Sequence, residues 1–129
     1  MPVYLNQLLV VGLGGFLGSA LRFMISGWAQ RLSPMGAFPV GTLAVNVIGC
    51  LAIGLLGGLA DQRQLLDSGQ RLFLMVGVLG GFTTFSSFAF ETLGLAQDGA
   101  LLRVFANVLL QLLLGFGAAA AGYLAARFL

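Results

Sequence analysis

The sequence lacks the residues on which most enzymes and metal sites depend. It has no histidine and a single cysteine, Cys50, and its 129 residues include only six basic and four acidic side chains. One cysteine excludes an intrachain disulfide, and without histidine or a cysteine pair there is no spacing typical of metal ligands. No two carboxylates lie close together in the sequence, so acid–base and thiol catalysis lose their usual groups. We therefore expect a protein that is not an enzyme.

Long apolar stretches occupy most of the chain. Hydrophobic residues make up 59% of the sequence, and its mean hydropathy is +1.02. Charges are missing from residues 1–21, 32–60, 72–90 and 104–126, and each stretch is close to or above the ~20 residues that a spanning helix needs. We predict an all-α integral membrane protein, multi-pass in the cell (inner or plasma) membrane. It forms a single domain, residues 1–129, with four transmembrane helices at approximately 3–27, 39–60, 71–96 and 101–127.

One segment of the third apolar stretch is unlike a lipid-facing helix. Residues 80–88, Gly-Gly-Phe-Thr-Thr-Phe-Ser-Ser-Phe, combine two helix-breaking glycines, four hydroxyls and three aromatic rings. The bilayer interior has no water to satisfy freed backbone groups, so such a break is tolerated only inside protein or beside a water-filled cavity. The third helix is therefore predicted to be broken, and the break to mark the functional centre.

Polar side chains inside the predicted spans are few, and each is costly in hydrocarbon. Asn46 lies in the second span, with Thr42 one turn earlier on the same helix face. The Asn46 amide would either donate to an anion in a pore or form an interhelical hydrogen bond that holds the bundle together. Asn107 and Gln111 form a second pair at the same spacing in the fourth span, and the sequence assigns them no role.

Two charged residues border the spans. Arg22 ends the first charge-free stretch, five residues before Gly27. Its side chain would either anchor the helix at the interface or place a fixed positive charge in a vestibule that attracts anions. Glu91 follows the broken segment and is expected to cap the bundle or to pair with an arginine.

The six basic residues, all arginine, divide evenly between the two membrane sides. With four spans, one side collects three and the other collects three: Arg63, Arg71 and Arg127 against Arg22, Arg31 and Arg103. A chain without a positive-inside bias inserts in both orientations, and an antiparallel pair forms a two-fold dimer with its axis in the membrane plane. The alternative interpretation is an undecided count from few charges.

Pairs of small residues four apart favour close helix packing in lipid. Five such pairs occur in the predicted spans: Gly14/Gly18, Gly54/Gly58, Gly77/Gly81, Gly115/Ala119 and Ala118/Gly122. Each pair alone is weak evidence because small residues are common in this sequence. Together they indicate a tightly packed bundle.

Three phenylalanines of the broken segment, Phe82, Phe85 and Phe88, recur every three residues and would share one helix face. This periodicity favours packing against lipid or against the bundle core. The alternative uses the ring quadrupole, whose positive edge attracts an anion while its negative face repels one.

Three motifs together resemble the Fluc (CrcB-like) fluoride channels. Residues 80–88, closing on Glu91, are similar to the third-helix signature of that family. Residues 14–22, which end at Arg22, resemble its first-helix glycines and arginine, and residues 41–46 resemble its second-helix motif. Length and span number match as well, so the resemblance covers the whole chain.

The resemblance implies a dual-topology antiparallel homodimer with two narrow pores, which carries fluoride passively out of the cell and relieves its toxicity. It implies that Asn46 donates a hydrogen bond to fluoride and that Phe85 and Phe88 present ring edges along each pore. Hydroxyls near the same path are expected from Thr84, Ser86 and Ser87. The remaining candidates are vestibule or structural residues, namely Arg22, Thr42 and Glu91.

The resemblance also implies a structural sodium ion at the centre of the dimer interface. Backbone carbonyls of the third-helix break, contributed by both subunits, would coordinate this ion. The matching positions in this sequence are Gly80 and Thr83.

The fourth span departs from the family pattern. Members of the family carry serine or threonine beside the phenylalanines there, whereas residues 115–122 of this chain are Gly-Phe-Gly-Ala-Ala-Ala-Ala-Gly. Water or the hydroxyls of residues 83–87 would have to replace that polar track.

Two other classes compete with the channel. A small multidrug transporter shares four spans and dual topology but needs a membrane-embedded carboxylate to exchange protons for cationic drugs. The first acidic residue is Asp61, so the first span has no such group. A structural subunit held together by glycine packing would not need the cluster of hydroxyls and rings.

Overall fold

The described part of the chain consists of helices joined by short connections. The computed structural model describes residues 2–129, with side chains from Tyr4 onward, and Met1 of the predicted domain lies outside the described residues. Four segments are long and apolar enough to cross a membrane: Tyr4–Leu32, Val40–Gln62, Ser68–Gln97 and Leu101–Phe128. Residues 2–129 contain no β-strand. The predicted all-α, multi-pass membrane fold is confirmed.

The third segment is assembled from several helical pieces, while the others are nearly continuous. The first, second and fourth segments are α1 (Pro2–Leu32), α2 (Val40–Gln62) and α6 (Leu101–Ala125), with a final 3₁₀ turn η2 (Ala126–Phe128). The third comprises α3 (Ser68–Arg71), the π-helix η1 (Leu72–Val78), α4 (Leu79–Phe82) and α5 (Phe85–Gln97). α1 continues past the predicted end at residue 27 as far as Leu32.

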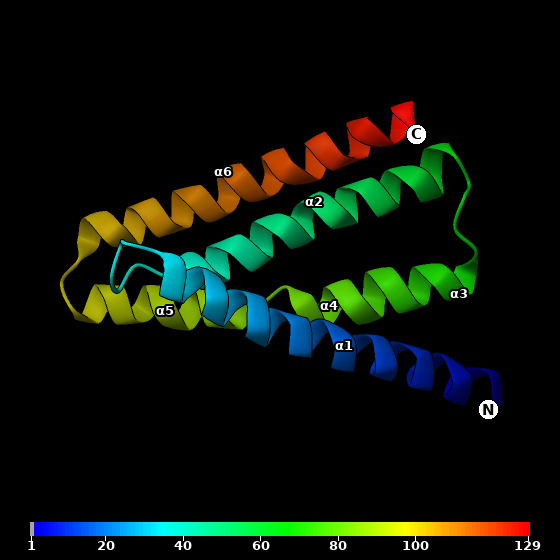
Figure 1. Cartoon of the computed structure of the whole chain (residues 1–129), viewed down its shortest axis with the longest axis horizontal. Coiled ribbons are helices and arrows are strands. Elements are labelled where there is room, and N and C mark those ends of the chain that lie inside the picture. The colour runs from blue at the N-terminus through cyan, green and yellow to red at the C-terminus, as the bar shows by residue number, and fades with distance from the viewer. Residues whose placement is uncertain (1) are drawn as a thin grey trace.

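Consecutive spans run antiparallel to each other, and the helices pack in two pairs (Figure 1). α2 lies along α6, and α1 lies along η1 and α4 of the third segment. The chain termini lie at the end of the bundle that also carries the connection between α2 and α3 (Figure 1). The other two connections, from α1 to α2 and from α5 to α6, lie at the opposite end.

Local sequence sets where the helices begin and end. Asp67 caps α3 through a capping box, in which Asp67 Oδ1 accepts from the Gln70 N–H at 2.8 Å and Gln70 Oε1 accepts from the Asp67 N–H at 3.1 Å. Gly36 and Gly99 have positive φ angles of 62° and 75° in the two connections at the opposite end. Glycine adopts this conformation without a steric penalty, so both connections stay short.

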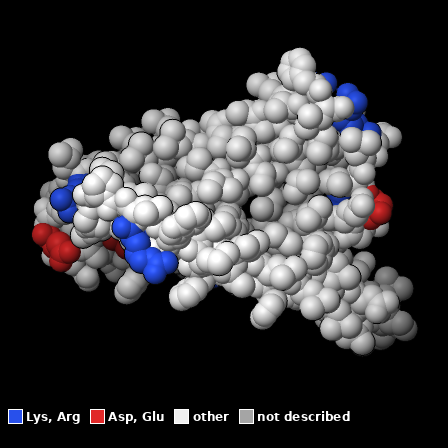
Figure 2. Space-filling view, viewed as in Figure 1, with Lys and Arg blue, Asp and Glu red and all other residues white. Residues whose placement is uncertain are grey.

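Charge is confined almost entirely to the two ends of the bundle. In Figure 2 most of the coloured side chains lie at the ends of the molecule, and the long surface between them is uncharged. Large apolar side chains such as Phe16, Phe90 and Phe116 are exposed on this surface at 71%, 76% and 75%. Such a surface suits contact with lipid or with another apolar helix.

Candidate functional site

The third segment breaks at Thr83 and Thr84, inside the bundle. Both residues have extended backbones, with ψ of 156° and 114°, between the end of α4 and the start of α5. Thr84 is the N-cap of α5, where its Oγ1 accepts a hydrogen bond from the Ser87 N–H at 3.1 Å. The predicted break is confirmed, and its new helix start is capped by one of its own hydroxyls.

Asn46 of α2 holds the broken backbone in place. Its Oδ1 accepts from the Thr84 N–H at 2.8 Å, and its Nδ2 donates to the Thr84 carbonyl at 3.0 Å. The same Nδ2 also donates to Gln111 Oε1 of α6 at 3.1 Å. One amide therefore satisfies two freed backbone groups and links three helices, which is how an irregular segment becomes tolerable at membrane depth.

Arg22 reaches the same break from α1. Its Nε donates to the Gly81 carbonyl at 3.0 Å, close to the end of α4. Because α1 runs on to Leu32, Arg22 lies well inside the helix and not at its end. This hydrogen bond links α1 to the end of α4.

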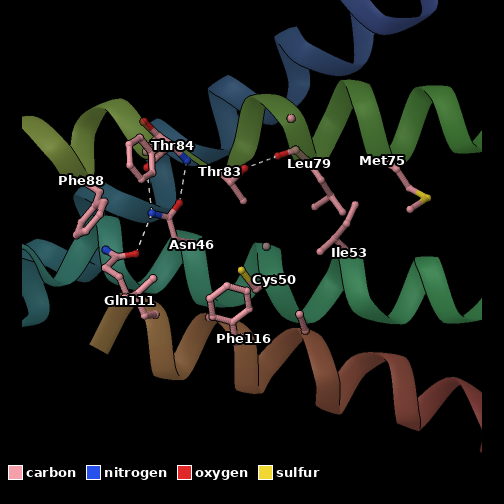
Figure 3. A pocket seen from close by; sticks show the side chains of 16 residues that line it. Asn46, Cys50, Ile53, Met75, Leu79, Thr83, Thr84, Phe88, Gln111 and Phe116 are labelled. Carbon is pink, nitrogen blue, oxygen red and sulfur yellow. Dashed lines mark hydrogen bonds between the residues drawn. The ribbon is translucent and has the colours of Figure 1, made fainter. Parts of the chain in front are cut away.

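A cavity of about 450 Å³ lies beside the break, between α2, the third segment and α6 (Figure 3). Phe85 and Phe88 line it and meet edge to face, with ring centroids 5.5 Å apart and an interplanar angle of 69°. Phe85 is 77% exposed, so the cavity is open on that side. Its lining is mostly apolar, and the main polar side chains are Asn46, Thr83, Thr84 and Gln111.

The two predicted serines lie beside the cavity and not in its lining. The Thr84 hydroxyl donates to Ser87 Oγ at 3.1 Å and lies 3.3 Å from Ser86 Oγ. Ser86 is exposed and Ser87 is half-buried. These hydroxyls form a small network at the start of α5, in contact with the break through Thr84.

Thr42 and Glu91 lie together at a second hollow, nearer the end of the bundle. The Thr42 hydroxyl donates to Glu91 Oε1 at 2.6 Å, and the other carboxylate oxygen of Glu91 is buried without a partner in residues 2–129. This hollow has a volume of about 480 Å³, and Gln30 and Asp98 also line it. The structure thus brings two predicted vestibule residues together, while Arg22 contacts the break instead.

Sequence reasoning left Gln111 without a role, but the structure brings it to Asn46. Their separation of 65 residues hides the contact from any local pattern. The only sequence clue was the spacing of Gln111 from Asn107 on one face of the fourth span. Asn107 itself is fully buried elsewhere, where its Nδ2 donates to Thr92 Oγ1 at 2.9 Å.

The break offers backbone oxygens that suit a hard cation. In a continued helix the Thr84 N–H would donate to the Gly80 carbonyl, and the Ser87 N–H would donate to the Thr83 carbonyl. Here those two N–H groups donate to Asn46 Oδ1 and Thr84 Oγ1, which leaves both carbonyls without their helical donors. A side chain added at Gly80 would meet nothing within 4 Å, so the backbone there is open. Within residues 2–129, no cluster of histidine, cysteine, aspartate and glutamate offers another metal site.

Comparisons with a family model and with individual proteins point to the same family. A family model described as "CrcB-like protein, Camphor Resistance (CrcB)" matches residues 9–123. The chain is 46% identical to the "Fluoride-specific ion channel FluC" of Paracoccus denitrificans, over 95% of each chain. It is 44% identical to the protein of that name from Nitratidesulfovibrio vulgaris, over 86% of this chain and 89% of the relative. The counterpart in Methylobacillus flagellatus is 48% identical over 72% of this chain and 73% of its own length.

Proposed function

The chain belongs to the CrcB-like family, and on that premise we propose that it is a fluoride channel. The proposal is carried by the helix break that Asn46 holds beside an open cavity. It is supported by relatives that are named fluoride-specific ion channels. A channel moves an ion without chemical change, so the protein is not an enzyme. The family match leaves no ground for a multidrug transporter.

The proposed pore uses neutral groups to replace the water around fluoride. Fluoride is small and strongly hydrated, so close donors must substitute for its water without holding the ion too tightly for it to leave. Phe85 and Phe88 line the cavity, and the electropositive edges of their rings would attract the fluoride ion. The hydroxyls of Thr84, Ser86 and Ser87 supply hydrogen-bond capacity beside the cavity, and Asn46 holds the Thr84 backbone in place there.

A second copy of the chain would complete the pore. The cavity is open beside Phe85, which is 77% exposed although it lines the site. We propose an antiparallel homodimer in which the partner closes this opening, so that one dimer holds two pores. Export of fluoride then follows passively, because a negative-inside potential expels an anion with about 2.3 kcal/mol per 100 mV.

A structural sodium ion is proposed at the centre of this dimer. The carbonyls of Gly80 and Thr83 would hold it, since both lack their usual helical donors. Sodium would supply positive charge that satisfies these oxygens and joins the two copies.

Fluoride release from liposomes tests the channel function. The purified protein is reconstituted into vesicles loaded with potassium fluoride, valinomycin is added, and an electrode follows the released fluoride. We expect rapid release from protein-containing vesicles and none above background from empty ones. Phe85→Ile and Asn46→Ala should each reduce the flux about tenfold or more while the dimer remains intact on gel filtration, since the first removes a ring edge from the pore and the second removes the amide that holds the helix break beside it.

Phe90→Ile is the matched control for Phe85→Ile. Phe90 lies on the same helix, is 76% exposed and does not line the cavity, so its replacement should leave the flux unchanged. Release no faster than from empty vesicles would refute the channel. Normal flux in both Phe85→Ile and Asn46→Ala would instead refute the proposed pore residues.

A further inference from the structure

Gln111 of α6 carries a buried hydrogen-bond donor that no group in the described part of the chain satisfies. Its Oε1 accepts from Asn46, but its Nε2 is buried and has no partner in the described part of the chain. Gln111 lines the same cavity as Phe85 and Phe88. A buried donor without an acceptor is unfavourable, so this nitrogen favours an acceptor that reaches it from the cavity.

The direction of this nitrogen is fixed by the broken backbone, through a chain of hydrogen bonds. The Thr84 N–H can only donate, so the atom of Asn46 that faces it must be the oxygen. The Asn46 nitrogen therefore faces Gln111 and can only donate, which requires the oxygen of Gln111 on that side. The Gln111 nitrogen is left turned away from Asn46, as Figure 3 shows.

Asn46 has no hydrogen left for an ion in this arrangement. A side-chain amide has two N–H hydrogens, and Asn46 gives one to the Thr84 carbonyl and one to Gln111. Donation from Asn46 to an anion would therefore break one of the bonds that hold the helix break. Among residues 4–129, no side chain or backbone group accepts either hydrogen of the Gln111 amide.

We propose that Gln111 Nε2, on α6, donates a hydrogen bond to the permeating anion. Asn46 is then a positioning residue that orients the Gln111 amide. This inference rests on the proposed channel function and refines its pore. Residues 115–122 of α6 have no hydroxyl side chain, and the Gln111 amide, one turn earlier, would supply a polar group in their place. The Thr84 N–H, Asn46 and Gln111 thus connect the helix break to a donor on a different helix.

Two variants of Gln111 test the proposal in the liposome flux assay. Gln111→Met keeps the length of the side chain and removes the donor, and we expect fluoride flux to fall about tenfold or more, as for the loss of one charge-assisted hydrogen bond. Gln62→Met is the matched control. It removes an exposed amide whose Nε2 donates to the Tyr123 carbonyl outside the cavity, so flux should stay at the wild-type level.

Gln111→Glu separates donation from support of Asn46. A carboxylate oxygen still accepts from Asn46, but the other oxygen faces the anion as an acceptor, so flux should again fall about tenfold or more. Wild-type flux in Gln111→Met or in Gln111→Glu, with the protein eluting as the wild type does, overturns the proposal. If Gln111→Met does not reconstitute, Gln111→Glu carries the test alone. Wild-type protein that releases no fluoride would instead refute the channel function itself.

The role of Asn46 is tested by a double-mutant cycle. If Asn46 acts through Gln111, Asn46→Ala should reduce flux in the wild type much more than it does in the Gln111→Met background. A purely structural loss would be the same in both backgrounds. Equal losses would therefore overturn the positioning role.

Discussion

Single glycines decide how closely α1 approaches the third segment. A Cβ atom at Gly18 would collide with the Val78 carbonyl and lie 3.0 Å from the Phe82 nitrogen. A Cβ atom at Gly14 would lie 2.6 Å from the Phe73 carbonyl oxygen. These neighbours are backbone atoms, so they can move away only if the helices separate.

We therefore predict that Gly18→Ala destabilises the protein. Overpacking of this kind costs about 1–3 kcal/mol, because α1 must move away from α4 and the Arg22 bond to Gly81 is strained with it. Thermal unfolding in detergent should show a lower midpoint for Gly18→Ala than for wild type.

Gly12→Ala is the control on the same helix. A Cβ atom there meets nothing within 4 Å, and alanine is the better helix former by roughly 1 kcal/mol in water. Its unfolding midpoint should equal or exceed that of wild type. Equal midpoints for Gly18→Ala and wild type would contradict the close contact.

The small-residue pairs of the sequence predicted these contacts unevenly. Gly14 faces Gly77 across the α1 interface, whereas Gly18 lies against Val78 and Gly81 lies against Gly15. Gly54 lies against the Ala119 backbone of α6. Gly115 is looser, because a Cβ atom placed there would have the Cys50 sulfur as its nearest neighbour, at 3.5 Å. A four-residue spacing indicates a face that permits close approach, but only the tertiary structure selects which faces meet.

The helix break could be predicted from the sequence, but the contacts that support it could not. Two glycines and a run of hydroxyl residues predict a helix break, which is not tolerated where the backbone faces lipid. The contacts of Thr84 with Asn46, 38 residues away, and of Arg22 with Gly81, 59 residues away, depend on how the helices pack. The same holds for the π-helix Leu72–Val78, which packs along α1.

The carbonyls freed at this element lead to a prediction about sodium. If sodium joins the Gly80 and Thr83 carbonyls of two copies, its removal leaves these oxygens without a partner at the dimer interface. Exchange of sodium for the large cation N-methylglucamine during purification should shift the protein from dimer toward monomer on gel filtration. Restoring sodium should restore the dimer, and identical elution in both cations would count against the proposed site.

Five of the six arginines lie at the ends of the bundle that the sequence predicted for them, and Arg22 does not. The connection from α2 to α3 and the chain's C-terminal end share one end of the bundle, which places Arg63, Arg71 and Arg127 together (Figure 1). Arg63 donates to the carbonyls of Arg127 and Leu129 there. Arg31 and Arg103 belong to the opposite end, while Arg22 lies deeper, at the break.

This balance predicts insertion in both orientations. Labelling of Ser33→Cys, in the connection from α1 to α2, tests it in a Cys50→Ala background that removes the only native thiol. A membrane-impermeant maleimide added to intact cells should label about half of the molecules, because the nearly even division of arginines between the two sides gives no strong preference for one orientation. Complete labelling, or none, would show one fixed orientation and would exclude an antiparallel dimer.

Added charge should then select one orientation. Gln64→Arg with Gln70→Arg raises the positive charge of the α2–α3 end, which the positive-inside rule places in the cytoplasm. The end that carries Ser33→Cys would then face outward, so labelling from outside should rise from about half toward completion. Fluoride flux should fall in the same cells, since an antiparallel dimer needs both orientations. A rise in labelling with undiminished flux would mean that parallel copies suffice, and it would refute the antiparallel assembly while leaving the channel function intact.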